Sequence, residues 1–526
     1  MTRIDERVST HVYKVKRISK EEMESIAGVC VYDQPPFCNA ACPLKLDVKA
    51  MLKAAAENDF KKAFKIYESI APFPLILSAG CGAPCEEKCR LCELGDGIAI
   101  GDIERAVALS GGAGEKRSIF RVRKKKKAAV FGSGLFALLL AGELEKKGYP
   151  VTAICGEADE EEYLRVAAGF LRENDFYTEL KRLRGKDIAF EFNAEMTREL
   201  FEEKRGGFDV LCASEKAALD IFPGAVRDEG IMLMESEGLL TGGGETVLEA
   251  ALGARKAALT ADRLAQGIDP RSARGEEGPV TSRLYTNPDL ARGLIRIKGC
   301  ESGDTREQAA EEAGRCMQCH CDECLRGCAY LRRFNKHPGL LSREIYNNTQ
   351  IIMGDHPLNR AMNACALCGQ CTVTCPHGFD MAHVCRTARE NMVDTDKMPL
   401  AAHEFALLDM LFSNGEAYLC RKQPGHSHCR YVFFPGCQAA AIAPEAVIAA
   451  YEDLCTRLKG GVALMLGCCG AIAHWAGRGE MYGEVRDKIA AELAALEDPV
   501  IIAGCPSCMK LLSEQDMAET VGIWTV

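Results

Sequence analysis

The 28 cysteines of this 526-residue chain are strongly clustered, and the clusters limit what the chain can fold into. Seven lie between Cys30 and Cys92, ten between Cys316 and Cys385, and eight between Cys420 and Cys508. Disulfide-stapled scaffolds are far smaller than this chain, which is long enough to form several cores. In a reducing compartment, clustered thiols are metal ligands more often than disulfides. The spacing therefore predicts a protein with several metal sites.

Composition and charge exclude other classes of protein. Hydrophobic residues make up 47% of the chain and charged residues 27%, as in ordinary globular proteins. The net charge of −10 argues against nucleic-acid binding, which needs a basic surface. The longest apolar stretch, residues 128–142, is too short to span a bilayer, and the N-terminus lacks the apolar run of a signal peptide. We therefore expect a cytoplasmic protein without a transmembrane segment.

The most specific motif is Cys365-x2-Cys368-x2-Cys371-x3-Cys375, followed by Pro376. This is the bacterial ferredoxin run, in which thiolates hold the corners of a [4Fe–4S] cluster. In two-cluster ferredoxins the fourth cysteine of the run serves the other cluster. The run predicts iron–sulfur ligation, and a structural zinc site is the alternative.

A second set of thiols precedes the run, with the spacing Cys316-x2-Cys319-x4-Cys324-x3-Cys328. We expect it to complete a pair of [4Fe–4S] clusters, with Cys328 and Cys375 crossing over. Its middle gap is longer than in the ferredoxin run, so Cys321 is an alternative to Cys319 or Cys324. A zinc knuckle is the alternative site, and Cys385 is expected to be a core thiol.

Seven thiols of the N-terminal region lie in two groups, Cys30-x7-Cys38-x3-Cys42-Pro43 and Cys81-x3-Cys85-x3-Cys89-x2-Cys92. The text F-C-N-A-A-C-P-L-K-L-D-V, then G-C-G-A-P-C-E-E-K-C and I-A-I-G-D-I-E-R, resembles the small subunit of NADPH-dependent glutamate synthase. The same domain occurs in dihydropyrimidine dehydrogenase. The resemblance covers roughly residues 25–110 and implies a helical domain that holds two [4Fe–4S] clusters.

The resemblance also implies ligand sets. Cys30, Cys38 and Cys89 would serve one cluster. The other cluster would take Cys42, Cys81, Cys85 and Glu104, because the family can use a Gln or Glu side chain there. One position departs from the family, which has a second cysteine where this chain has Asp33. The first cluster therefore needs a further ligand, and Cys92 or Asp33 is expected to supply it.

Residues 126–155 have the pattern of a strand, a G-x-G-x-x-A turn, a helix and a second strand. Gly132 permits the tight turn, Gly134 allows a pyrophosphate to approach the backbone, and Ala137 allows close helix packing. The glutamate synthase family binds FAD at the corresponding place. The second strand ends in Cys155 rather than an acidic residue, and Gly244 stands where the family's closing flavin motif has aspartate. The alternatives are bound FAD and a Rossmann scaffold that only packs between cluster domains.

The C-terminal cysteines form one further motif, with Phe434-Pro435-Gly436-Cys437, then Cys468-Cys469-Gly470, then Cys505-x2-Cys508. An adjacent Cys–Cys pair suits a site where one thiolate bridges irons. The motif resembles the CCG domain of heterodisulfide reductases, and of the iron–sulfur subunits of glycolate oxidase and anaerobic glycerol-3-phosphate dehydrogenase. The resemblance implies a fifth or non-cubane cluster, with zinc as the alternative. Heterodisulfide reductases have two such domains, and this chain has one copy.

The remaining cysteines are not expected to bind metal. Cys420 and the sequence from His426 to Cys429 are interpreted as an exposed loop. Four isolated thiols are expected to be small buried apolar side chains, namely Cys155, Cys212, Cys300 and Cys455.

Together these patterns predict a multidomain α/β protein with four segments. Residues 1–115 would form a helical iron–sulfur domain, and residues 116–270 a degenerate Rossmann domain of the FAD/NAD(P)-binding type. Residues 271–400 would form a linker and an α-helical two-cluster ferredoxin domain, and residues 401–526 a CCG domain.

The expected function is that of an electron-transferring subunit of an anaerobic redox complex. It would relay single electrons between a flavoprotein or ferredoxin donor and an acceptor dehydrogenase or reductase at the CCG end. One alternative is a self-contained flavin-dependent NAD(P)H or heterodisulfide reductase. The other is an assembly scaffold that holds zinc.

Overall fold

The computed structural model describes residues 19–111, 123–272, 274–297, 305–398, 402–515 and 517–526. It divides the chain into two compact units. One unit contains residues 33–321, and the other combines the N-terminal residues up to Tyr32 with Asp322–Val526. The N-terminal helix packs with the ferredoxin-type residues, so residues far apart in the sequence share one unit. No helix of the described residues is long and apolar enough to cross a membrane.

The first part of the Asp33–Cys321 unit is a bundle of short helices around one apolar core. Its helices are α3 (Phe37–Ala41), α4 (Val48–Ala56), α5 (Phe60–Glu68), α6 (Pro74–Gly80), α7 (Pro84–Glu87) and α8 (Ile100–Ser110). Residues 48–70 lack Gly and Pro, yet they form two helices rather than one. Asn58 has φ of 59°, and the Asp59 side chain caps α5 by accepting from the Lys62 amide. This cap begins the second helix.

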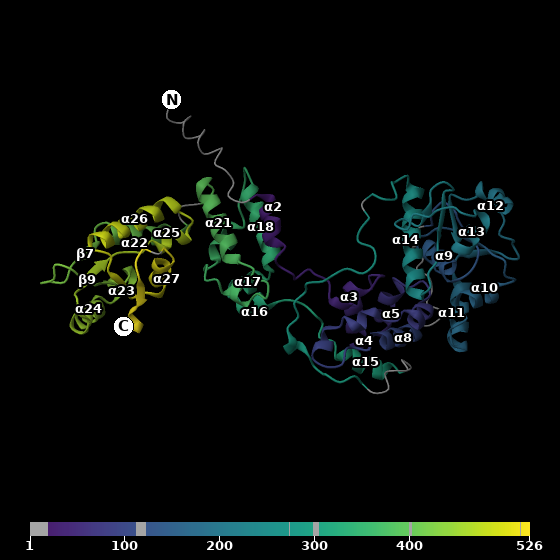
Figure 1. Ribbon diagram of the computed structural model, residues 1–526, viewed down its shortest axis with the longest axis horizontal. Helices are drawn as coiled ribbons and strands as arrows, with labels where there is room; N and C mark the ends of the chain where they lie inside the picture. The colour runs from purple at the N-terminus through teal and green to yellow at the C-terminus, as the bar shows by residue number, and fades with distance from the viewer. Residues whose placement is uncertain (1–18, 112–122, 273, 298–304, 399–401, 516) are drawn as a thin grey trace, which may run out of the picture. The chain divides into compact units, whose positions relative to one another are not determined.

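A Rossmann-like sheet follows in the same unit, with the strand order β3-β2-β1-β4-β6-β5. Its strands are β1 (Ala128–Phe131), β2 (Val151–Ile154), β3 (Ile188–Glu191), β4 (Val210–Ser214), β5 (Leu233–Met234) and β6 (Leu239–Gly242). All neighbours pair in parallel except β5 and β6. Helices pack around the sheet, as Figure 1 shows: α9 (Leu135–Lys146), α10 (Glu160–Ala168), α11 (Glu173–Gly185), α12 (Arg198–Arg205), α13 (Glu215–Ile221) and α14 (Val247–Gln266).

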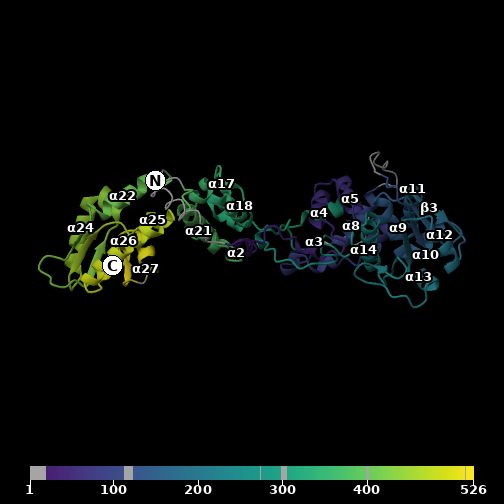
Figure 2. The same ribbon diagram turned by 90° about the horizontal axis from the view of Figure 1, so that it is seen from above.

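The other unit begins with α2 (Lys20–Ala27), which packs against α18 (Pro338–Gln350). Both views show purple α2 beside green α18 (Figures 1 and 2). The Glu24 carboxylate pairs with Arg343 at 3.0 Å, and the rings of Tyr32 and His337 stack with centroids 4.4 Å apart. The remaining helices of this part are α16 (Glu323–Gly327), α17 (Ala329–Phe334), α19 (Asn359–Ala364), α20 (Gln370–Thr374) and α21 (Met381–Asp394).

The unit ends in a second sheet with the order β11-β10-β8-β9-β7. Its strands are β7 (Leu419–Arg421), β8 (Tyr431–Phe434), β9 (Val462–Leu466), β10 (Val500–Ala503) and β11 (Thr520–Gly522). All neighbours are parallel except β7 and β9. The associated helices are α22 (Glu404–Asn414), α23 (Cys437–Ile442), α24 (Pro444–Arg457), α25 (Ala471–Trp475), α26 (Gly479–Ala495) and α27 (Pro506–Glu514).

Candidate metal centres

Four predicted ligands line one cavity of about 430 Å³ in the helical part that contains α16 to α21. They are Cys328, Cys365, Cys368 and Cys371. Three come from the ferredoxin run, and Cys328 joins them from the upstream run between α16 and α17. Cys328 thus lines the same cavity as three thiols of the ferredoxin run, as the expected crossing requires. Four thiols around one cavity fit a cluster with one thiolate at each corner.

Cys365 has a distinct environment within this group. A hydrogen bond with the thiol of Cys385 lowers the pKa of the Cys365 thiol to about 7. Cys385 is fully buried in α21, as expected of a core thiol. The buried guanidinium of Arg389 donates to the carbonyl oxygens of Cys365 and Met362. These contacts fix the loop that carries Cys365, so a ligand at this position is oriented before any metal binds.

The other thiols of the ferredoxin-type part belong to its apolar core. Cys324 is buried in α16, and Cys375 is partly buried at the end of α20. Cys30 packs against the same core, where a Cβ on Gly339 would lie 2.8 Å from the Cys30 Cβ. The structure thus assigns Cys30 to a different compact unit from Cys38 and Cys89, the residues with which the family resemblance grouped it.

A second group of candidate ligands lies in the N-terminal helical bundle. Burial and the charge of Glu104 raise the pKa of the Cys81 thiol to about 12, and the same two causes raise the pKa of Cys85. Cys42 lies in the same group, and its sulfur accepts a hydrogen bond from the Leu46 amide at 3.4 Å. Glu104 projects from α8 and is 3% exposed. The structure thus brings together the four residues that the family resemblance grouped for one cluster.

The polar atoms of this group point to a ligand. Burial raises the pKa of Glu104 to about 8, so the carboxyl group is mostly protonated at neutral pH when no cation is present. The hydroxyl of Tyr67 is fully buried beside Glu104 and shares a hydrogen bond with its carboxyl group. Positive iron held by Cys42, Cys81, Cys85 and Glu104 would offset the cost of burying their thiolate and carboxylate charges, so these residues fit the group.

Four further thiols gather at another site of the bundle, and they differ from the expected set. They are Cys38, Cys89, Cys316 and Cys319. Burial raises the pKa of Cys38, and the charges of the other three thiols raise it further. Burial raises the pKa of Cys316 to about 11, with added effects of Cys319 and Cys89. The sequence interpretation placed Cys316 and Cys319 with Cys324 and Cys328, whereas in the structure these two thiols also lie beside Cys38 and Cys89.

The two residues expected to complete the first N-terminal cluster are on the surface. Cys92 and Asp33 are both exposed. The Cys92 thiol donates to the carbonyl oxygen of Glu86 at 3.4 Å. Neither residue is needed as a ligand if Cys316 and Cys319 take these positions. Spacing alone missed this solution because the two groups are separated by more than 200 positions, as the contact between Lys49 and Cys319 also illustrates.

Five thiols meet at the C-terminal sheet. The Cys437 thiol interacts with Cys468, Cys468 with Cys469, and Cys469 with Cys508, each by a hydrogen bond between side chains. A Cβ on Gly436 would lie 3.2 Å from both the Cys505 Cβ and the Cys508 sulfur. These residues follow the neighbouring strands β8, β9 and β10. Because parallel strands end at one edge of a sheet, three distant loops converge there.

The spacing of these thiols bears on the zinc alternative. Four-coordinate zinc needs its thiolates at about 2.3 Å from one point. In the described residues, no group of three or more His, Cys, Asp or Glu side chains converges closely enough to hold a single ion.

The remaining cysteines are outside these groups. Cys155 and Cys212 are fully buried, as expected of small apolar side chains, whereas Cys455 is only partly buried. Cys420 lies in β7 and Cys429 is fully buried, so the exposed loop expected around them is only partly present. Cys300 falls outside the described residues.

The Rossmann turn fits an anion better than a complete flavin nucleotide. Gly134 has φ of 98° and open space where a Cβ would stand, whereas a Cβ on Gly132 would meet the Ser214 hydroxyl at 2.5 Å. Ala137 is fully buried in α9. At the other expected contact, a Cβ on Gly244 would come within 2.5 Å of the Ala250 amide nitrogen. The structure has no room there for the aspartate of the family motif, so the residues do not fit the full FAD site.

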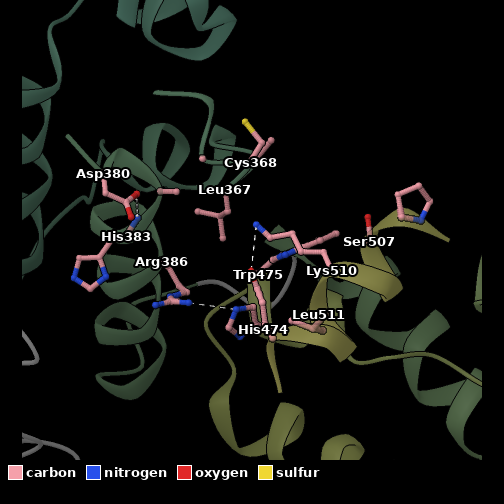
Figure 3. Close-up of a pocket in the computed structure, with 15 residues that line it drawn as sticks. Leu367, Cys368, Asp380, His383, Arg386, His474, Trp475, Ser507, Lys510 and Leu511 are labelled. Atoms are coloured by element: carbon pink, nitrogen blue, oxygen red, sulfur yellow. Dashed lines mark hydrogen bonds and ion pairs between the residues drawn. The ribbon is translucent and has the colours of Figure 1, made fainter. Parts of the chain in front are cut away.

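A cavity of about 520 Å³ lies between the ferredoxin-type thiols and the CCG sheet (Figure 3). Its walls include Cys368, His383 and Arg386 on one side and His474 and Lys510 on the other. His474 shares a contact of 3.4 Å with Arg386. Burial and then the charge of Arg386 lower the pKa of His474 and so favour its neutral form. The CCG helix α27 forms part of the wall and carries Cys508, so this cavity adjoins both thiol groups of the unit.

Comparisons with known proteins agree with these groups. Residues 7–112 match the family of dihydropyrimidine dehydrogenase domain II with its 4Fe-4S cluster. Residues 315–380 match a 4Fe-4S dicluster domain, and residues 431–513 match a cysteine-rich domain called CCG. The chain carries three iron–sulfur or cysteine-rich family domains. The resemblances expected for the N-terminal, ferredoxin-type and C-terminal regions are thereby confirmed.

The curated relatives are components of redox enzymes. The chain is 28% identical over 230 residues to the beta subunit of an NADPH-Fe(3+) oxidoreductase of Geobacter sulfurreducens. This match covers 41% of this chain and 33% of the relative. It is 28% identical over 159 residues to the beta subunit of an NADP(+)-dependent formate dehydrogenase of Moorella thermoacetica, covering 26% of this chain and 21% of the relative. It is also 29% identical over 146 residues to the glutamate synthase [NADPH] small chain of Azospirillum brasilense, covering 26% and 29%. The matches therefore span a third or less of each of these relatives.

Proposed function

We propose that the chain is an iron–sulfur electron-transfer subunit of an anaerobic redox complex. It would relay single electrons between a flavoprotein or ferredoxin donor and a site in the CCG domain. The family matches support iron–sulfur domains at three places in the chain, and the relatives are components of redox enzymes. Bound [4Fe–4S] clusters supply one-electron redox centres to such a chain.

The observation that carries this proposal is the grouping of Cys328 with Cys365, Cys368 and Cys371 around one cavity. A four-thiol set drawn from two separate runs is the ligand pattern of a two-cluster ferredoxin. A structural zinc site does not need this crossing. The CCG thiols lie in the same unit, and the 520 Å³ cavity adjoins both groups. The geometry supports transfer between a ferredoxin-type site and a CCG site.

The chain's own residues would orient and tune these sites. Backbone and side-chain N–H groups donate to sulfurs, as from Leu46 to Cys42 at 3.4 Å and from the Gln318 amide to Cys316 at 3.4 Å. Hydrogen bonds to ligand sulfurs raise the reduction potential of a cluster because they stabilise added negative charge. Arg389 fixes the Cys365 loop through backbone carbonyls and excludes rearrangement of that ligand.

A self-contained NAD(P)H reductase has less support in the geometry. Direct oxidation of a nicotinamide needs a two-electron acceptor such as a flavin. The crowding at Gly244 and the replacement of the acidic residue at the end of β2 by Cys155 both disfavour a flavin site. We therefore assign the Rossmann-like part a packing role within its unit.

Anaerobic purification with iron, zinc and flavin quantification tests the proposal. The three four-ligand sets described above would contain about 12 irons as cubanes, and the expected second ferredoxin-type cluster and a cluster at the CCG site would add to that number. Reduction by a low-potential donor should then produce the EPR signals of interacting iron–sulfur clusters. A preparation with few irons and several zinc ions per chain would instead establish the scaffold.

A further inference from the structure

The four thiols Cys38, Cys89, Cys316 and Cys319 lie close together, although they come from the beginning and the end of the sequence of one compact unit. Cys38 lies in α3 and Cys89 follows α7, whereas the other two follow α15 (Arg306–Gly314). All four are partly buried and pack against the same apolar core. Each of the two distant thiols interacts electrostatically with Cys89 and with the other. The site therefore contains one thiol for each corner of a cubane.

Helix α15 is held on the N-terminal bundle by buried polar contacts, so this proximity is built into the fold. Glu312 is fully buried, and its carboxylate accepts from the Ala99 amide at 3.0 Å and from the Ile297 amide at 2.9 Å. Arg315 is 5% exposed and donates to the Asp96 carbonyl at 2.5 Å. In Figure 1, α15 lies beside α4 and α8, in agreement with the contacts between these helices.

The loop after α15 is fixed as well. The Lys49 ammonium group donates to the carbonyl oxygen of Cys319 at 2.9 Å, a contact between residues 270 positions apart. The Gln318 side chain donates in turn to the Lys49 carbonyl at 3.3 Å and to the Cys316 sulfur at 3.4 Å. Because α4 carries Lys49, the loop with both thiols is anchored to the bundle next to Cys38.

Cys316 and Cys319 have the spacing of the cysteine pair that the resembling family has at the positions of Cys30 and Asp33. The resembling family has two cysteines separated by two residues at the positions of Cys30 and Asp33. In this chain the second position is Asp33, which is exposed, and Cys30 packs in the other unit. Cys316 and Cys319 are also separated by two residues. A pair with the required spacing is thus present at the site, but it comes from a later part of the chain.

We propose that Cys38, Cys89, Cys316 and Cys319 hold one [4Fe–4S] cluster whose ligands join the two ends of the Asp33–Cys321 unit. The proposal rests on the iron–sulfur function proposed above. It makes this cluster a covalent link between the N-terminal bundle and the segment that leads to the ferredoxin-type residues. Two consequences follow. Cys92 is not a ligand of this cluster, and Cys316 and Cys319 are not ligands of the ferredoxin-type clusters.

Iron counting in the full-length chain tests the ligand set. Cys38→Ser and Cys316→Ser should each remove about four irons, and the double variant should remove the same four, because one cluster is lost once. Cys316→Ser combined with Cys371→Ser should remove about eight. Cys92→Ser is the matched control, since its thiol is exposed near Cys89, and it should retain all irons. Loss of about eight irons in Cys38→Ser/Cys316→Ser would overturn the proposal.

A measurement on the unmodified chain tests the same ligand set if the variants fail to fold. Slow removal of iron by a chelator, with alkylation of the released thiols, should label Cys38, Cys89, Cys316 and Cys319 at one common rate. Labelling of Cys316 and Cys319 together with Cys365 and Cys371 would contradict the proposed set. A wild-type chain that binds no iron would refute the electron-transfer function itself, which is a different outcome from iron-rich protein with the wrong grouping.

Discussion

The guanidinium group of Arg389 donates a hydrogen bond of 2.6 Å to the carbonyl oxygen of Trp475. Arg389 lies on α21, after the ferredoxin run, and Trp475 ends α25, the helix that follows the Cys468–Cys469 pair. The same guanidinium donates to the Cys365 carbonyl. Close packing accompanies the contact, since a Cβ on Gly477 would come within 2.6 Å of the Glu390 amide nitrogen. One buried side chain thus joins a ferredoxin-type ligand to the CCG domain.

Replacing the Arg389 side chain should destabilise the unit and slow electron transfer between the two sites. Arg389→Met leaves the carbonyls of Met362, Cys365 and Trp475 without their donor, and we expect the free energy of unfolding of this unit to fall by about 3 kcal/mol. Electron transfer from the ferredoxin-type site to the CCG site should slow, as measured by rapid-mixing spectroscopy. Arg386→Met is the control on the same helix, because Arg386 makes one long contact to His474. Equal effects of both variants would show that the Arg389 contacts do not couple the two sites.

The ferredoxin run makes a direct prediction for Cys371. This thiol is 6% exposed and lines the 430 Å³ cavity with three other thiols. Cys371→Ser should remove one cluster and about four irons, seen by iron analysis and by loss of one component of the EPR spectrum. Cys455→Ala, a thiol outside all four groups, should leave both unchanged. The assignment is wrong if Cys371→Ser keeps the iron content and spectrum of the wild type.

Glu104 is expected to be a ligand through oxygen. Glu104→Gln preserves a side-chain oxygen at the same place and should retain the cluster, with a shifted reduction potential because the formal charge changes. Glu104→Ala removes the ligand and should cost about four irons or leave an incomplete cluster. Redox titration followed by EPR distinguishes these results. Full iron content and an unchanged potential in Glu104→Ala would exclude Glu104 from the ligand set.

The CCG thiols are predicted to form the outlet of the chain. Cys469→Ala should leave the ferredoxin-type clusters intact, since the thiols that line the 430 Å³ cavity and the other expected ligands lie outside the CCG sheet. Electron delivery to the natural acceptor should nevertheless collapse, because a terminal relay cannot be bypassed. Iron content and donor-to-acceptor turnover in the reconstituted complex are the two measurements. Turnover at the wild-type rate would mean that the outlet lies elsewhere and that the CCG site is structural.

The Rossmann-like part predicts a negative result. With crowding at Gly244 and no acidic residue at the end of β2, the isolated chain should not oxidise NADH or NADPH. The assay uses an artificial acceptor under anaerobic conditions, together with flavin quantification. Steady turnover of either nucleotide, or one bound flavin per chain, would restore the flavoprotein hypothesis.

Local spacing was sufficient for some of these sites. The ferredoxin run predicted its own cluster, because ligands two and three residues apart reach adjacent corners of a cubane without help from the rest of the fold. The resemblance around Glu104 likewise brought together a set that the structure also assembles. The CCG motif indicated its five thiols for a related reason, since the Cys–Cys and Cys-x2-Cys spacings are local, and in the structure each of the three groups follows a strand. The ferredoxin run has only short chain between its ligands, and the CCG thiols follow successive strands of one sheet.

Only the tertiary structure decided which unit receives Cys30 and which receives Cys316 and Cys319. Their positions depend on the packing of α2 on α18 and of α15 on the N-terminal bundle, and both contacts join residues hundreds of positions apart. A C-x2-C pair has the same local structure whichever other thiols lie beside it, so its spacing does not indicate which thiols complete the site. The buried Glu312 and Arg315 supply that information, because their hydrogen bonds to Ala99 and Asp96 are satisfied only when α15 docks on the bundle.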